Sequence, residues 1–212
     1  MFMKIKNIPK VYWSSEKPLN LKPKISTFFF LCLGLTLFGL GEGLLIVSFA
    51  GASPWSVLAQ GIALNVDLST GIITIFVSIC VLLLWLPLKQ KPGIATLVDI
   101  FWIGTVADLV ISLDLNAETL VLKWIFVFIG ILCIGSGTAI YVGADMGSGP
   151  RDGVMVGLES KGLKIGMARN VIEVTALTLG WLLGGTVGLS SVVIAISIGP
   201  VVQLVIPYFD LR

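Results

Sequence analysis

Acidic side chains within apolar segments are the groups in this sequence best suited to chemistry. Glu42, Asp108 and Glu173 lie within or at the end of apolar runs, and Asp99 lies near the start of one, where we expect it at a membrane interface. A charge inside such a run costs about 3 kcal/mol on insertion scales, so it usually faces the interior of a helix bundle. There a carboxylate can bind a solute or exchange a proton, or it can serve only to bond a neighbouring helix.

Two short segments that begin near a proline, residues 53–64 and 149–159, are the next candidates. Proline suits the first position of a helix, and about twelve helical residues extend only about 18 Å, too short to cross a bilayer. We interpret both as re-entrant or interfacial half-helices, with Ser53 as the cap of the first. Their turns and first residues are Gly51, Pro54, Gly147, Gly149 and Pro150.

Charged residues suggest a binding role for the second half-helix. A helix N-terminus carries partial positive charge and suits an anion. Arg151 would reinforce that charge, whereas Asp152 would oppose it or pair with Arg151. The alternative is a cytoplasmic helix cap held by an Arg151–Asp152 pair. The first half-helix has Trp55 in place of Arg151, and interfacial anchoring is favoured there over ligand stacking.

Catalytic and metal chemistry find little support. The sequence contains no histidine, which removes histidine-dependent catalysis and the common zinc motifs. The three cysteines lie singly in apolar runs, as packing residues do, and have no metal or disulfide spacing. We find no nucleophile–base pair and no Walker loop. We therefore expect no enzyme, no catalytic residue, no metal and no cofactor.

The composition is that of an integral membrane protein. Charged residues make up 12% of the 212 residues, against about 25% in soluble domains, and 56% are hydrophobic. The net charge of +2 gives no reason to expect nucleic acid as a partner. The expected partners are the lipid bilayer and an unknown small solute. The runs that approach the ~20 residues needed for a crossing are 26–50, 69–88, 94–113, 120–142, 168–187 and 190–207.

Positive charges orient these six segments. Residues 1–24 hold six lysines and three prolines, which predicts a basic, mobile arm on the membrane surface. With this arm in the cytoplasm, every lysine and arginine except Lys123 falls on the cytoplasmic side, as the positive-inside rule requires. We predict an all-α protein with six transmembrane helices and with both termini in the cytoplasm.

The chain contains an internal repeat. A shift of 96 residues superimposes five glycine pairs and one proline pair: 34 on 130, 39 on 135, 41 on 137, 51 on 147, 61 on 157, and Pro54 on Pro150. A shift of 95 places Asp108 on Gln203 and Ser78 on Glu173. We interpret 25–113 and 114–212 as two repeats of one membrane domain, each with three spans and a half-helix. Because three crossings is an odd number, the second repeat must be inverted relative to the first.

Polar positions shared by both repeats are expected near the axis that relates them. The candidate pathway residues are Glu42, Ser53, Trp55, Asp108, Arg151, Asp152, Glu173 and Gln203. Gly180, Gly184 and Gly188 recur every four residues, which is typical of a helix contact stripe. Such a stripe would pack within the protein or form a homodimer.

The two half-helix segments carry a family resemblance. Residues 51–61 include Ser53-Pro54-Trp55, and residues 147–158 include Gly149-Pro150-Arg151-Asp152. These motifs resemble those of the bacterial YczE/YyaS/YitT group of membrane proteins. The resemblance extends over nearly the whole chain after the arm. The resemblance implies a location in the bacterial inner membrane. It supplies no established substrate and no functional residues.

Two classes of function fit these features. The first is a secondary transporter or channel for a small polar or charged solute, because inverted repeats with broken helices recur in transporters. The alternative is a non-transporting accessory or regulatory protein that binds cytoplasmic or membrane partners through the arm and the segment 153–164. Deleting residues 1–22 separates them, because a transporter should keep its flux and an accessory protein should lose its partner.

Overall fold

The computed structural model describes residues 11–68, 70–115 and 117–209. These residues form helices and connecting loops and contain no strand, which confirms the prediction of an all-α chain. The α-helices are α1 (Ile25–Val47), α2 (Pro54–Val66), α3 (Thr70–Leu83), α4 (Trp85–Leu88), α5 (Ile94–Ser112), α6 (Leu120–Gly143), α7 (Pro150–Ser160), α8 (Ile165–Leu182) and α9 (Leu189–Val205), followed by the 3-10 turn η1 (Ile206–Phe209).

Three of these helices, α1, α5 and α6, are long and apolar enough to cross a membrane. The segment Ile72–Leu88 and α9 are apolar but shorter. Helix α8 has 18 residues and carries Arg169 and Glu173, which lower its hydropathy. Large apolar side chains such as Phe101 and Phe128 are exposed on the outside of the bundle, where lipid rather than water suits them.

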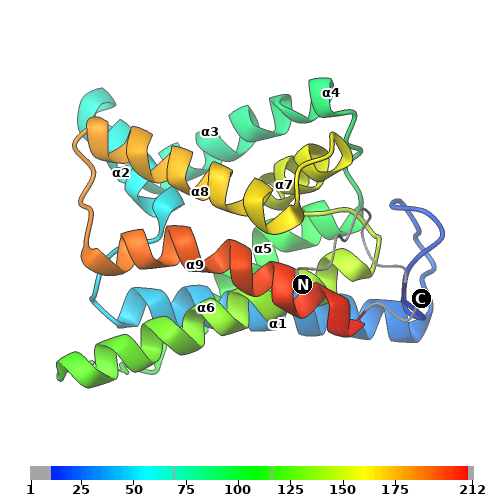
Figure 1. The fold of residues 1–212 in the computed structure, drawn as a ribbon, viewed down its shortest axis with the longest axis horizontal. Coiled ribbons are helices and arrows are strands. Elements are labelled where there is room, and N and C mark those ends of the chain that lie inside the picture. The colour runs from blue at the N-terminus through cyan, green and yellow to red at the C-terminus, as the bar shows by residue number, and fades with distance from the viewer. Residues whose placement is uncertain (1–10, 69, 116, 210–212) are drawn as a thin grey trace.

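The long helices lie side by side along the long axis of the molecule, and the chain runs back and forth between its two ends (Figure 1). Helices α1 and α6 run in opposite directions. The short helix α2 lies towards one end, and the short helix α7 lies towards the other (Figure 1). The described chain begins and ends towards the same end, the one that holds α7 (Figure 1).

Glycines set the close approach of α1 and α6 at the centre of the bundle. A Cβ atom placed on Gly34 would lie 2.6 Å from the Tyr141 amide nitrogen, and one on Gly137 would lie 2.6 Å from the Gly34 carbonyl oxygen. A second contact brings Gly41 against Gly130, where a Cβ on Gly41 would lie 2.7 Å from the carbonyl oxygen of Gly130. Larger residues at these positions would force the helices apart.

Short helices are present at both positions where half-helices are predicted, and we keep the name half-helix for α2 and α7. Helix α2 has 13 residues and α7 has 11, and each begins at its proline. The turns before them contain Gly51 at φ +146° and Gly147 at φ +96°, conformations that favour glycine. Ser53 is the N-cap residue of α2 as predicted, but its hydroxyl lies 3.0 Å from the Ser56 hydroxyl and makes no capping bond to a backbone N–H.

The N-terminal arm differs from its prediction. Residues 1–10 lie outside the described part of the chain, but residues 11–24 contain a docked segment rather than a mobile surface arm. Trp13 is 4% exposed and stacks on Phe30 with 4.2 Å between ring centroids. The Ser14 hydroxyl donates to the Gly143 carbonyl at 2.7 Å, so the segment covers the end of α6.

The predicted glycine stripe is also wrong, because α8 ends at Leu182 and the run 168–187 is not one helix. Gly184 lies in the following loop at φ +93°, and Gly188 precedes α9. Only Gly180 remains on α8, where it packs against the backbone of α2, and a Cβ there would lie 2.6 Å from the Val57 carbonyl carbon. Gly180 therefore takes the alternative of packing within the protein, and the homodimer stays a prediction.

Candidate functional site

A fully buried group of ionic and hydrogen-bonding side chains joins the ends of α6, α7 and α8. The Arg169 guanidinium pairs with the Asp152 carboxylate and, through Nε, with Glu173 Oε1 at 2.9 Å. The Tyr141 hydroxyl donates to the other Asp152 oxygen and accepts from the Gly149 N–H at 3.2 Å. We call Tyr141, Asp152, Arg169 and Glu173 the buried ionic cluster.

Local sequence explains how these groups meet. Asp152 is in the first turn of α7, where the helix dipole favours a negative charge. Arg169 and Glu173 are four residues apart and therefore share a face of α8. The predicted Arg151–Asp152 pair is not the partnership observed, because Asp152 takes Arg169 and Arg151 turns to a different carboxylate.

A second group lies between the two half-helices. The Arg151 Nη1 atom of α7 is 3.8 Å from Glu42 Oε1 of α1, and its Cζ atom is 5.2 Å from the centre of the Trp55 ring of α2. The side chains of Arg151 and Glu42 are 29% and 16% exposed. We call Glu42, Trp55 and Arg151 the half-helix contact. Sequence analysis selected all three residues but expected Trp55 to be an interfacial anchor.

Asp99 and Tyr141 are site residues that sequence analysis did not select. Asp99 is half-buried on α5, and its carboxylate lies against Gly149, where a Cβ atom would be 2.8 Å from Oδ1. Arg151 is one of its charged neighbours. Asp99 therefore lies beside the turn that precedes α7 and belongs to the site. The available signal was its carboxylate within the apolar run 94–113.

Together the two groups and Asp99 contain more negative than positive groups. Four carboxylates face two guanidinium groups: Glu42, Asp99, Asp152 and Glu173 against Arg151 and Arg169. If all six are ionised, the site carries a charge of −2. A buried excess of this kind is unfavourable unless a cation or protons compensate it.

Three of the predicted pathway residues lie apart from these groups. Asp108 is exposed on α5 and belongs to neither group. Gln203 is half-buried, and its side-chain oxygen accepts from the Gly166 N–H at 3.2 Å, a bond between α9 and α8. Ser53 bonds only within its own turn. The predicted pairing of Asp108 and Gln203 near a shared axis is therefore not observed.

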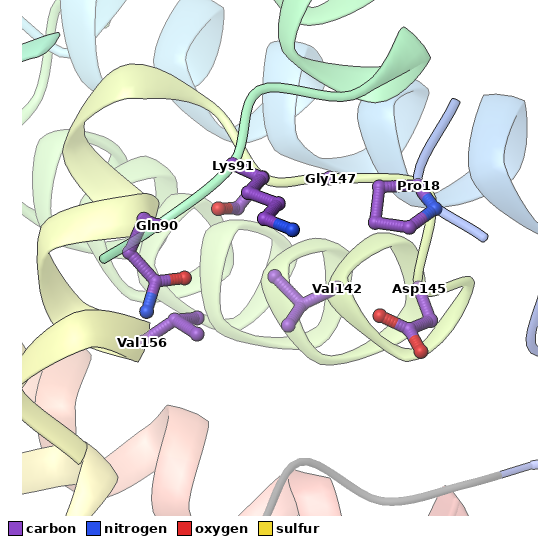
Figure 2. Close-up of a pocket in the computed structure, with 8 residues that line it drawn as sticks. Pro18, Gln90, Lys91, Val142, Asp145, Gly147 and Val156 are labelled. Atoms are coloured by element: carbon purple, nitrogen blue, oxygen red, sulfur yellow. The ribbon is translucent and has the colours of Figure 1, made fainter. Parts of the chain in front are cut away.

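A pocket of about 200 Å³ opens beside the turn that precedes α7 (Figure 2). Pro18, Lys91 and Asp145 line its rim, and Gly147 and Ser148 form part of its wall. Gly149, the residue after Ser148, donates its backbone N–H to the Tyr141 hydroxyl of the buried ionic cluster. The pocket therefore brings solvent to within one turn of the site, at the end of the molecule that holds α7.

The fold and the site define a class: a helical membrane protein with ionic side chains clustered where half-helices meet the long helices. The chain belongs to a family of unknown function, DUF6198, whose model matches residues 25–207. It is 38% identical over 204 residues to an uncharacterised protein of Haemophilus influenzae, covering 96% of this chain and 93% of that one.

Two Bacillus subtilis relatives confirm the resemblance to the YczE/YyaS group. The uncharacterised membrane protein YczE is 30% identical over 185 residues, covering 85% of each chain. The uncharacterised protein YyaS is 26% identical over 183 residues, covering 84% of this chain and 91% of that one. No solved structure matches. The name of YczE and the apolar helices agree on a membrane protein.

Proposed function

We propose that this protein is a secondary transporter or channel for a small polar or charged solute. Its membrane domain would cross the bacterial inner membrane six times, as two inverted repeats, with both termini in the cytoplasm. The solute would bind between the half-helices α2 and α7. The observation that carries the proposal is the contact between Trp55 and Arg151, the residues that follow the first proline of each half-helix.

Contacts between α1 and α6 support the repeat because they map onto one another. A shift of 96 residues along the sequence superimposes Gly34 on Gly130 and Gly41 on Gly137. The observed contacts are Gly34 with Gly137 and Gly130 with Gly41. Exchanging each glycine for its repeat equivalent turns the first contact into the second. A two-fold relation between the halves produces this reciprocity.

Contacts with the last helix of each half follow the same rule. A Cβ on Gly39 would meet the Cβ of Val106 at 2.7 Å, and one on Gly135 would meet the Cβ of Val201 at 3.1 Å. These pairs are equivalent under the shifts of 96 and 95. Helix α5 also begins as α9 does, because the Gly93 N–H donates to Thr96 Oγ1 at 3.0 Å and the N–H of residue 188 donates to the hydroxyl of residue 191 at 3.1 Å.

The direction of the helices favours inversion. Equivalent helices α1 and α6 run in opposite directions (Figure 1), so an axis that relates them lies across the helices rather than along them. In a bilayer such an axis lies in the membrane plane, as in transporters with inverted repeats and broken helices at the midplane. The half-helices would then enter from opposite faces and meet at Trp55 and Arg151.

Cysteine labelling tests the six-span arrangement. In a background with Cys32, Cys80 and Cys133 replaced by alanine, Lys91→Cys and Thr186→Cys place single exposed thiols at opposite ends of the molecule. We expect an impermeant maleimide to label Thr186→Cys in intact cells and Lys91→Cys only in inverted vesicles. Labelling of both from the same side would refute the inverted arrangement.

Transport is tested with purified protein in liposomes. A thermal-shift screen identifies solutes that stabilise the protein, because a ligand that binds the folded state raises its stability. A solute found in this way should accumulate in or leave proteoliposomes. We expect Glu42→Gln to abolish that flux while the protein still inserts. Unchanged flux in this variant would remove Glu42 from the pathway, and no flux for any stabilising solute would argue against transport.

A further inference from the structure

We infer that the solute is a small organic cation, and that the Arg151 guanidinium occupies its binding site in this structure as a tethered substitute. The inference rests on the proposed function, because it names the class of solute for the half-helix contact. It follows from the unequal pairing of the two arginines, the aromatic face, the carboxylates of the site and the unpartnered indole N–H of Trp55.

The two arginines are held very differently. Arg169 is 2% exposed and pairs closely with both Asp152 and Glu173, so it is a fixed part of the protein. Arg151 is 29% exposed and its ion pair with Glu42 spans 3.8 Å, longer than a hydrogen bond. A loose pair of this kind contributes little and can be exchanged. Arg151 can therefore leave its position at small cost.

The surroundings of the Arg151 guanidinium form a cation site. Its Cζ atom lies 5.2 Å from the centre of the Trp55 ring, within the range of a cation–π interaction. Glu42 supplies one carboxylate, and Asp99 supplies a second carboxyl group nearby. An ammonium or guanidinium group of a solute would find the same ring face and the same carboxylates.

The net charge favours a cation over an anion. With Arg151 in place, four carboxylates still face only two guanidinium groups. If all six groups are ionised, an anion bound to Arg151 would add to the negative excess, whereas a cation would reduce it. The helix N-terminus of α7 alone would favour an anion, but Asp99 and Asp152 already lie beside it.

An unpartnered polar atom indicates that the solute also carries a neutral polar group. Among the described residues, the buried Trp55 Nε1 atom is one of those that have no hydrogen-bond partner. Buried indole N–H groups usually have one. Trp55 is also the residue whose ring faces the Arg151 guanidinium, so its N–H lies at the half-helix contact. A hydroxyl or carbonyl oxygen on the solute would accept a hydrogen bond from the Trp55 indole N–H.

Binding is tested on the full-length protein in detergent, with methylguanidinium chloride as the probe and sodium chloride and sodium acetate as controls at equal ionic strength. We expect methylguanidinium to raise the melting temperature of the wild type in a saturable way. Arg151→Ala should bind it about 10-fold more tightly, because the tethered competitor, present at an effective concentration of about millimolar or more, is removed.

Substitutions in the site separate a specific from a general effect. We expect Glu42→Gln to weaken binding about 10-fold, the value of a charge-assisted contact. Trp55→Leu should weaken it and Trp55→Phe should largely retain it, because the aromatic face is kept. Glu118→Gln is the matched control, because Glu118 is an exposed carboxylate outside the site, and its binding should equal that of the wild type.

Two results would overturn the inference. One is the absence of any methylguanidinium effect in both the wild type and Arg151→Ala. The other is stabilisation by acetate that disappears in Arg151→Ala. If Arg151→Ala does not fold, Arg151→Met tests the same competition, because it keeps a side chain of similar length but removes the tethered cation, and it should also bind the probe more tightly than the wild type.

Flux measurements distinguish failure of the inference from failure of the proposed function. Methylguanidinium binding that depends on Glu42 and Trp55, without flux in proteoliposomes, would support a cation site and refute transport. Flux of an anion or a neutral solute that methylguanidinium does not inhibit would support transport and refute the cation site.

Discussion

Replacing Arg169 by methionine is expected to destabilise the protein far more than the same substitution at Arg151. Arg169 and its two carboxylates have side-chain exposures between 2% and 4%, so the substitution leaves Asp152 and Glu173 buried without a counter-charge. Removing one member of a buried ion pair costs about 3–5 kcal/mol. Methionine has a similar shape, so the loss reports charge rather than a cavity.

Arg151→Met provides the matched control. Its pair with Glu42 is long and partly exposed, which makes it worth about 0.2–1 kcal/mol, and its contact with Trp55 adds about 0.5–1 kcal/mol. Substituting Asp152→Asn, Arg169→Met and Glu173→Gln together removes all the charges of the buried ionic cluster. We expect this neutral triple variant to recover most of the stability lost in Arg169→Met.

Thermal unfolding of purified variants in detergent micelles measures these differences. At roughly 2–4 °C per kcal/mol for a chain of this size, Arg169→Met should lower the melting temperature by about 6–20 °C. Arg151→Met should lower it by only a few degrees. Equal effects of the two substitutions, or a triple variant less stable than Arg169→Met alone, would refute the assignment of Arg169 as a fixed structural charge.

Three further substitutions test other parts of the structure. Gly137→Ala should reduce the yield of folded protein, because its Cβ would lie 2.6 Å from a carbonyl oxygen of α1. Gly104→Ala is the control and should not reduce the yield, because Gly104 has open space around it. Size-exclusion profiles in detergent compare the two variants. Trp13→Ala should release the docked segment and speed its cleavage by trypsin, and Tyr12→Ala, at 60% exposure, should have a much smaller effect. Asp108→Asn should leave solute binding and flux unchanged, since its side chain is exposed; a loss of either would return it to the pathway.

The positions of Asp99 and Asp108 show what helical periodicity can and cannot predict. Asp99 and Asp108 are nine residues apart, two and a half turns of α5, so they must lie on opposite faces. Periodicity alone does not say which of them faces the bundle. Packing decides which carboxylate faces the bundle. Gly43 of α1 lies against Val110 of α5, because a Cβ atom placed on Gly43 would be 2.6 Å from the Val110 Cβ. This contact turns the face of α5 that carries Asp99 inwards.

The docked arm shows a different limit. Its lysines and prolines predict a mobile polar segment, and that expectation rests on local composition. The contact between Ser14 and Gly143 joins residues 129 positions apart, and the stacking of Trp13 on Phe30 joins the segment to α1. Local sequence carries no signal for such contacts, because burial of Trp13 depends on where α1 and α6 come together.

The sequence by itself determined the membrane class, the all-helical fold and the two half-helices, because these follow from hydropathy, from helix length and from proline and glycine at fixed local positions. Only the tertiary structure decided which charges meet. Asp152 has Arg151 beside it in the chain and Arg169 seventeen residues away, and it pairs with Arg169. The choice depends on the angle at which α7 enters the bundle and on the face that α8 presents to it, and long-range packing sets both.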